Sequence, residues 1–252
     1  FLKSNAPAAA EKEAVEVLRR NPSNVQAAVL YGDSFLLRKE WKKAEQVYTS
    51  MMKQMPKSSV GYFKMGLSRK LQNKPSEAAG LFSQAIERSP KDLTAINEYV
   101  FALAAAKQVD KAKKVLDDYV AKEPKNPLLW EMAGRFNLAG RKQVEAESAF
   151  LKAIELSPEY TQPYYALGVL YASQKKLPEA EEKFGKVVEK NDKNAGAHTL
   201  LGVVQNSLGK IDESNKHYRR ALELTPKNTL AANNLASNLS DHGGNMDEAL
   251  KF

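Results

Sequence analysis

The chain has 252 residues, of which 43% are hydrophobic and 27% charged, with a net charge of +8; this composition predicts a folded protein rather than a disordered one. It contains no cysteine, which excludes disulfides and thiolate metal sites. Its longest purely apolar run, residues 99–106, is far shorter than the roughly 18 residues needed to span a bilayer.

A helix-ending phrase built around a proline recurs every 34 residues. It holds Pro22, Pro56, Pro90, Pro124, Pro158 and, after a gap of two periods, Pro226. Asp192 stands at the skipped place, and we interpret the site as a helix stop that does not strictly require proline. A fixed period of this length is the signature of a repeat architecture.

Three further positions keep the same period. The first is small: Gly32, Gly66, Val100, Gly134, Gly168 and Gly202. The second is also small: Ala10, Ala44, Ala78, Ala112, Ala146, Ala180 and Ser214. The third is mostly aromatic: Ala14, Tyr48, Phe82, Leu116, Phe150, Phe184 and Tyr218. Small residues let two helices approach closely and an aromatic ring fills the space beside them, so each repeat is predicted to be an antiparallel helix pair.

The predicted elements form one array over residues 1–252. A lone second helix near 8–21 comes first. The chain starts at Phe1 without a methionine, and we interpret it as part of a longer protein. Complete repeats follow at 25–58, 59–92, 93–126, 127–160, 161–194 and 195–228, and a truncated repeat at 229–252. Good N-cap residues precede their first helices: Asn24, Ser58, Asp92, Asn126, Asn194 and Asn228, with Tyr160 as the exception.

With these residues in view, the chain resembles the tetratricopeptide repeat family. The repeat 127–160 carries Trp130, Gly134, Ala146, Phe150, Ala153 and Pro158, and the repeat 161–194 carries Tyr164, Leu167, Gly168, Tyr171, Ala180 and Phe184. The resemblance implies an all-α fold: a right-handed superhelical solenoid of antiparallel helix pairs, in which the first helix of each pair lines a concave groove.

Two parts of the chain depart from the family pattern. The repeat 93–126 has Val100 for the glycine, Leu116 for the aromatic and Tyr119 for a small residue, so we expect altered helix spacing there. In the last repeat Ala249 lies one place late. The end of the chain, from Asn233 onward, also resembles bacterial arrays associated with envelope or exopolysaccharide export, which implies the periplasmic side of the cell envelope, with the cytoplasm as the alternative.

The sequence shows no catalytic constellation, no metal-ligand cluster and no cofactor motif, so we expect no enzyme activity, no metal and no cofactor. Of the three histidines, His198 occupies the early aromatic position of its repeat, and we favour a packing role for it over a ligand role. Gly32 and Gly66 lie inside helices, where close packing explains them better than phosphate binding does.

Function is therefore expected in the groove, as a non-catalytic scaffold that binds a peptide or protein segment. On a first helix, residues four apart share a face. The predicted groove residues are Val29, Asp33, Phe63, Leu67, Asn97, Phe101, Glu131, Arg135, Tyr165, Val169, Thr199 and Asn233. This mixture of apolar groups, aromatic rings and isolated charges is typical of peptide recognition.

Other partners and roles remain open at this point. The groove positions include a single basic residue, Arg135, which argues against nucleic acid despite the net charge. The lysine and asparagine clamp by which family members bind chaperone tails does not map onto positions such as Val29 and Asp33. The alternatives are a self-assembling structural module, and a regulatory or substrate-binding arm of a larger enzyme or export machine. We expect no membrane insertion by this part of the chain, and homo-oligomers are possible.

Overall fold

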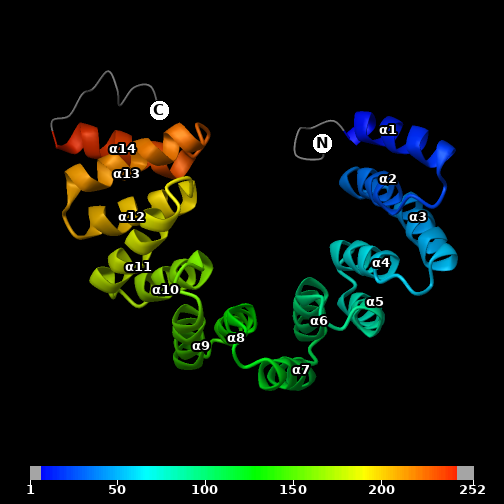
Figure 1. The fold of residues 1–252 in the computed structure, drawn as a ribbon. Coiled ribbons are helices and arrows are strands. Elements are labelled where there is room, and N and C mark those ends of the chain that lie inside the picture. Colours follow the sequence, from blue (N-terminus) through cyan, green and yellow to red (C-terminus); the bar gives the residue numbers. More distant parts are fainter. Residues whose placement is uncertain (1–6, 243–252) are drawn as a thin grey trace. The chain divides into compact units, whose positions relative to one another are not determined.

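The structure is a computed structural model that describes residues 7–242. Within those residues the chain is all-α, with fourteen helices and no strand (Figure 1). In chain order the helices are α1 (Pro7–Arg20), α2 (Val25–Leu37), α3 (Trp41–Gln54), α4 (Val60–Leu71), α5 (Pro75–Arg88), α6 (Leu93–Ala105), α7 (Val109–Lys122), α8 (Pro127–Ala139), α9 (Gln143–Leu156), α10 (Thr161–Ser173), α11 (Leu177–Lys190), α12 (Ala195–Ser207), α13 (Ile211–Leu224) and α14 (Thr229–Asp241).

Every predicted complete repeat contains two of these helices, a first helix and a second helix. The helix pairs run from α2 and α3 in 25–58 to α12 and α13 in 195–228, and α1 lies where the lone second helix is expected. Helix α14 starts the truncated repeat. The rest of that repeat, including the turn before Ala249, lies outside the described residues. The repeat boundaries themselves stay a prediction.

Side-chain caps start most of the first helices. The Asn24 carboxamide oxygen accepts a hydrogen bond from the Ala27 N–H at 2.9 Å, and the residues at the same repeat position in α6, α8, α12 and α14 do the same. The expectation for Ser58 is wrong by one residue, because α4 has Ser59 as its N-cap and Ser59 makes no side-chain capping bond. As expected, Tyr160 supplies no side-chain cap to α10.

The turn between the two helices of a repeat always contains one residue in the left-handed region of backbone conformation. These residues also recur every 34 positions: Lys39, Asn73, Lys107, Arg141 and Lys175, with φ of 58–61°, and Gly209, with φ of 77°. A residue of this conformation ends the first helix and lets its last carbonyls accept further N–H groups. The Lys39 N–H, for example, donates to the Leu36 carbonyl at 3.0 Å.

The core repeats a single contact between a glycine of the first helix and an aromatic ring of the second. A Cβ atom added to Gly134 would lie 2.4 Å from the Phe150 ring, and Gly32, Gly66, Gly168 and Gly202 face Tyr48, Phe82, Phe184 and Tyr218 just as closely. The Phe150 and Phe82 side chains are fully buried. Only glycine leaves room for the ring at this position, which confirms the predicted packing in five of the six complete helix pairs.

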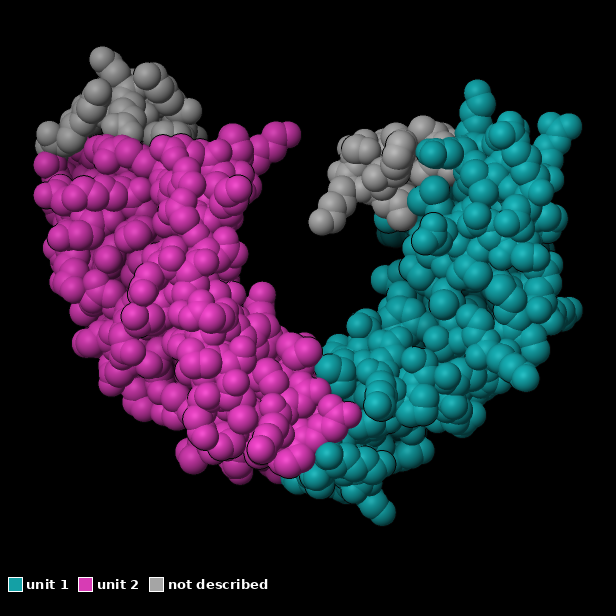
Figure 2. All heavy atoms as spheres, viewed as in Figure 1, with its two compact units in different colours: residues 1–122 teal, residues 123–252 magenta. Residues whose placement is uncertain are grey.

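The described chain divides into two compact units after Lys122 (Figure 2). The first unit ends with α7, the second helix of the repeat that departs most from the family pattern. In that repeat Val100 and Leu116 hold the glycine and aromatic positions, and both are buried. A larger residue on one helix is thus accompanied by a smaller one on the other. The expected change in helix spacing stays a prediction.

None of the helices in the part of the chain that the structure describes is long and apolar enough to cross a bilayer.

Candidate functional site: the first-helix faces

All twelve predicted groove residues lie on first helices. We call the surface that carries them, in each unit separately, the first-helix face. In the first unit it holds Val29, Asp33, Phe63, Leu67, Asn97 and Phe101, from α2, α4 and α6. In the second unit it holds Glu131, Arg135, Tyr165, Val169, Thr199 and Asn233, from α8, α10, α12 and α14. The six residues of the first unit are all partly exposed, as binding residues must be.

Two aromatic rings of these faces are each held by a buried ring beneath them. The Phe63 ring lies 5.6 Å from the Phe82 ring, centroid to centroid, within the first unit. The Tyr165 ring meets the Phe184 ring edge to face at 5.7 Å within the second unit. Both spacings lie in the range that favours aromatic pairs. Phe63 and Tyr165 are therefore fixed in place while part of each ring remains exposed.

Asp33 is already engaged by neighbouring side chains. Its carboxylate accepts a hydrogen bond from the Tyr48 hydroxyl at 2.7 Å and forms an ion pair with Lys64 at 2.6 Å. The Asp33 and Lys64 side chains are only 17% and 20% exposed. The Asp33 carboxylate thus links the first helices α2 and α4 to the second helix α3, and its main role is in holding this face together.

The second unit presents one charged pair on its first-helix face. Glu131 and Arg135, one turn apart on α8, form an ion pair at 2.7 Å, with side chains 12% and 43% exposed. Burial raises the pKa of Glu131, and Arg135 opposes that rise. Burial, with a further contribution from the Glu131 charge, raises the pKa of the nearby Tyr160 hydroxyl to about 12. Of Glu131 and Arg135, Arg135 is the more exposed, so its guanidinium is the group of this ion pair that a partner can reach.

The remaining predicted residues of this face differ in their exposure. Val169 is 40% exposed and Asn233 is exposed, so both are open to a partner. Thr199 is buried at 4% exposure. Its hydroxyl donates to the Ala195 carbonyl at 2.8 Å and accepts from the Asn228 carboxamide at 2.7 Å. Thr199 therefore supports the face from within, and we omit it from the proposed contact surface.

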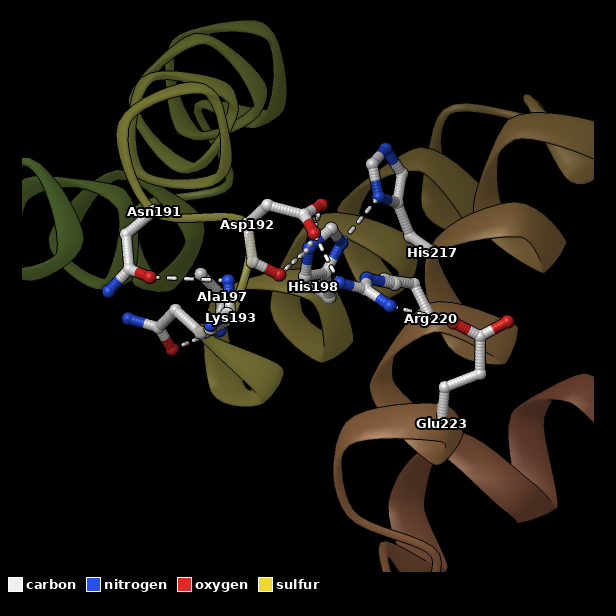
Figure 3. Close-up of polar contacts among 9 residues, drawn as sticks. Asn191, Asp192, Lys193, Ala197, His198, His217, Arg220 and Glu223 are labelled. Carbon is white, nitrogen blue, oxygen red and sulfur yellow. Dashed lines mark hydrogen bonds and ion pairs between the residues drawn. The ribbon is translucent and has the colours of Figure 1, made fainter.

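A histidine pair lies away from these faces, between α12 and α13 (Figure 3). The His198 and His217 Nδ1 atoms are 2.9 Å apart, and the His198 Nε2 atom is 3.1 Å from the Asp192 carbonyl oxygen. Since a carbonyl only accepts, His198 donates through Nε2, and its Nδ1 atom then accepts from the His217 N–H. His198 is 4% exposed, which supports the packing role predicted for it.

Asp192 does more than the predicted helix stop. Its carboxylate forms an ion pair with Arg220 and approaches the His198 Nε2 atom at 3.4 Å (Figure 3). Arg220 also pairs with Glu223 at 2.9 Å. These contacts join the turn before α12 to α13. They were not predicted, because a residue at a helix stop can be recognised locally, whereas Arg220 lies 28 residues further along the chain.

Among residues 7–242 no three histidine, aspartate or glutamate side chains gather in a way that could hold a metal ion. The first-helix faces are surfaces of stacked helix pairs with partly exposed aromatic, apolar and charged groups. Extended surfaces of this kind are characteristic of helical-repeat proteins, and the fold and the site place this chain in that class.

Comparison with known families identifies the class more closely. Four tetratricopeptide repeat models match residues 1–57, 71–135, 149–182 and 195–228, which together make up most of the chain. The chain belongs to the tetratricopeptide repeat family, whose members are generally non-catalytic scaffolds for protein–protein interaction. A search of curated proteins finds no significant match.

Solved structures show the same fold at low sequence identity. Yeast Tom70 is 13% identical, with a TM-score of 0.71 over 94% of this chain and 60% of that one. Pseudomonas aeruginosa pilF is 16% identical, with a TM-score of 0.57 over 84% of this chain and 96% of that one. The APC/C hetero-tetramer Cut9–Hcn1 has a TM-score of 0.61 and 14% identity over 92% of this chain. This chain spans only 46% of the matched chain in that complex.

Proposed function

We propose that this scaffold binds a peptide or protein segment on its first-helix faces. The observation that supports this most is the pair of supported rings, Phe63 and Tyr165. Each is partly exposed and each rests on a buried ring of the second helix. An aromatic side chain held in this way loses little conformational freedom on binding, which is typical of residues that dominate binding energy.

The charged groups of the faces limit what the partner can be. Asp33 is compensated by Lys64, whereas Arg135 is the more exposed member of its pair with Glu131. A partner segment of the second unit therefore carries apolar anchors for Tyr165 and Val169 and a carboxylate that approaches Arg135. Nucleic acid is disfavoured, since it requires rows of basic residues interleaved with aromatic ones, and these faces hold mainly apolar and neutral groups.

The test is selection of binding peptides from a random library, followed by calorimetry with variants of the chain. We expect Tyr165→Ala or Phe63→Ala to weaken binding of a selected peptide by about 2 kcal/mol or more, because each removes a desolvated aromatic anchor. The control is Lys186→Glu on α11, which disturbs only an exposed ion pair with Glu189 at 2.8 Å. Circular dichroism verifies that each variant is folded.

The opposite pattern would overturn the proposal. If Lys186→Glu abolished binding while Tyr165→Ala and Phe63→Ala left it intact, the second helices would carry the binding surface. Raising the salt concentration separates a direct contact of Lys186 from a long-range effect on the association rate, since exposed charges are screened within about 10 Å at 0.1 M salt.

A further inference from the structure

A pocket of about 530 Å³ opens among α1, α2 and α3 in the first unit. Its apolar wall is formed by Leu18, Ala28, Tyr31, Phe35, Val47 and Met51. The side chains on its α3 edge are polar, among them Lys43, Gln46 and Ser50. This volume lies within the roughly 300–1,000 Å³ that is usual for ligand pockets.

The pocket lies where most other repeats place a large side chain of their own. In the other complete repeats, the position of Ala28 is held by Tyr62, Ile96, Trp130, Tyr164 and His198; in the truncated repeat, Ala232 of α14 holds it. The Trp130 indole N–H donates to the Pro124 carbonyl in the preceding turn at 2.8 Å. His198 contacts the equivalent carbonyl, that of Asp192, and also reaches His217 on its own second helix. The side chain at this position therefore fills the space between the preceding turn and the second helix.

The same space is left open in the first repeat. Pro22 stands at the repeat position of Pro124 and Asp192, and Val47 stands at that of His217. Both Pro22 and Val47 line the pocket, together with Ala28. The methyl group of Ala28 is too small to fill a site that holds an indole, a phenol or an imidazole ring in four of the other complete repeats.

The third repeat supplies an independent comparison. A pocket of about 320 Å³ lies there among Ile86, Pro90, Tyr99, Val115 and Tyr119, which are the equivalents, two repeats on, of Leu18, Pro22, Tyr31, Val47 and Met51. Ile96, which is fully buried, holds the position of Ala28. The pocket is thus the smaller of the two where the side chain at this position is larger.

We propose that the first-repeat pocket binds an aromatic side chain of a partner protein, with tryptophan as the preferred residue. The partner's ring takes the place that Trp130 fills in its own repeat, and its N–H donates to the Pro22 carbonyl as Trp130 does to Pro124. This site goes beyond the function proposed above. Ala28, Tyr31 and Phe35 lie on a different side of α2 from Val29 and Asp33, because residues along a helix turn by about 100° each.

The probe for the test is N-acetyl-L-tryptophanamide, which presents an indole on a peptide unit. We expect the melting temperature of the chain to rise with probe concentration in a saturable way, since the probe binds the folded state. Amide chemical-shift changes should concentrate in α1–α3. The variant Ala28→Trp fills the pocket with the chain's own ring, so it should melt at a higher temperature without probe and show no further rise with it.

Two comparisons sharpen the result. N-acetyl-L-leucinamide should bind at least tenfold more weakly than the tryptophan probe if the pocket selects an aromatic ring. Val47→Gln, which makes the half-buried wall polar, should reduce probe affinity at least tenfold without touching the first-helix faces. This second variant tests the pocket even if Ala28→Trp does not fold.

The proposal fails if folded Ala28→Trp melts at a lower temperature than the parent, because the space would then not fit a ring. It also fails if Val47→Gln or Ala28→Trp binds the probe as tightly as the parent chain does, or if the parent shows no saturable binding. Loss of peptide binding in Tyr165→Ala has no bearing on these outcomes, so the two proposals can be judged separately.

Discussion

Two tyrosines at the same repeat position differ in what their hydroxyl groups contact. Both rings are fully buried against a glycine of the first helix. The Tyr48 hydroxyl donates to Asp33 at 2.7 Å. No hydrogen-bond partner for the Tyr218 hydroxyl is found among the described residues, and burial raises its pKa to about 12. A buried hydroxyl without a partner is destabilising, whereas one bonded to a carboxylate is stabilising.

We therefore expect opposite effects from the same substitution. Tyr48→Phe should lower the free energy of unfolding by about 1.5 kcal/mol or more, because it removes a hydrogen bond to a charged group. Tyr218→Phe should leave the stability unchanged or raise it by up to about 1 kcal/mol, since Phe150 and Phe184 already hold this position elsewhere. Urea denaturation measures both. Equal losses in the two variants would contradict the contacts described for Asp33.

The histidine pair predicts a pH dependence of stability. Burial and the neighbouring His198 lower the pKa of His217, and Lys216 acts in the same direction, while Asp192 and Glu181 oppose them. In the unfolded chain the same group titrates near about pH 6.5. The unfolded state thus binds more protons in the window between the lowered pKa and about 6.5. Stability should therefore fall as the pH is lowered through that window.

His217→Asn is the matched control for this prediction. Asparagine places a neutral amide near the position of the Nδ1 atom but does not titrate. Urea denaturation at pH 7.5 and pH 5.5 should show a smaller loss of stability for the variant than for the parent chain. An identical loss in both would show that groups other than His217 cause the pH dependence.

At the scale of a helix pair, the turn between first and second helix imposes a conformational cost. Gly209 is the only glycine among the six left-handed residues of the described turns, and an added Cβ there would meet nothing within 4 Å. Any effect of Gly209→Ala is thus due to backbone conformation. We expect a loss of about 1–2 kcal/mol in the free energy of unfolding.

Gly185 provides the matched comparison for Gly209. It lies inside α11 in an ordinary helical conformation, and a Cβ there also meets nothing within 4 Å. Gly185→Ala should stabilise the chain by about 0.5–1 kcal/mol, because alanine is the better helix former. If both substitutions changed stability by the same amount and sign in thermal denaturation, the left-handed conformation of Gly209 would carry no cost.

The helix pairs were predictable from the sequence because their signals are local and repeated. Periodic prolines, cap residues such as Asn24, and the matched positions of Gly134 and Phe150 each report a property of a single helix or pair. The left-handed turns were missed, since lysine or arginine holds four of the six positions and carries no turn signal. The first-repeat pocket was also missed, because the small side chain of Ala28 is recognised as unusual only by comparison with the other repeats.

At the scale of the whole chain, each helix pair contacts mainly its neighbours, so stability should be local. Phe184→Ala should lower the free energy of unfolding by about 3–5 kcal/mol. Hydrogen exchange should then show lost protection in α10, α11 and α12, with little change in α4–α6 of the first unit.

Two further variants serve as comparisons. Phe82→Ala should remove protection in α4–α6 and leave α10–α12 little changed. Lys113→Ala, on the exposed side of α7, should lower the free energy of unfolding by less than roughly 0.5 kcal/mol. A uniform loss of protection throughout residues 7–242 would instead show one cooperative structure.

The pairing of Val100 with Leu116 has a consequence for recombination among the repeats. A crossover that exchanges whole repeats keeps each glycine with its own aromatic ring, and Val100 with Leu116. A crossover within a repeat could join α6 to α9 and place Val100 against the Phe150 ring, where even the Cβ of an alanine would lie 2.4 Å from the ring in the native pair. Duplications and deletions of this gene that involve the repeat 93–126 should therefore begin and end between helix pairs.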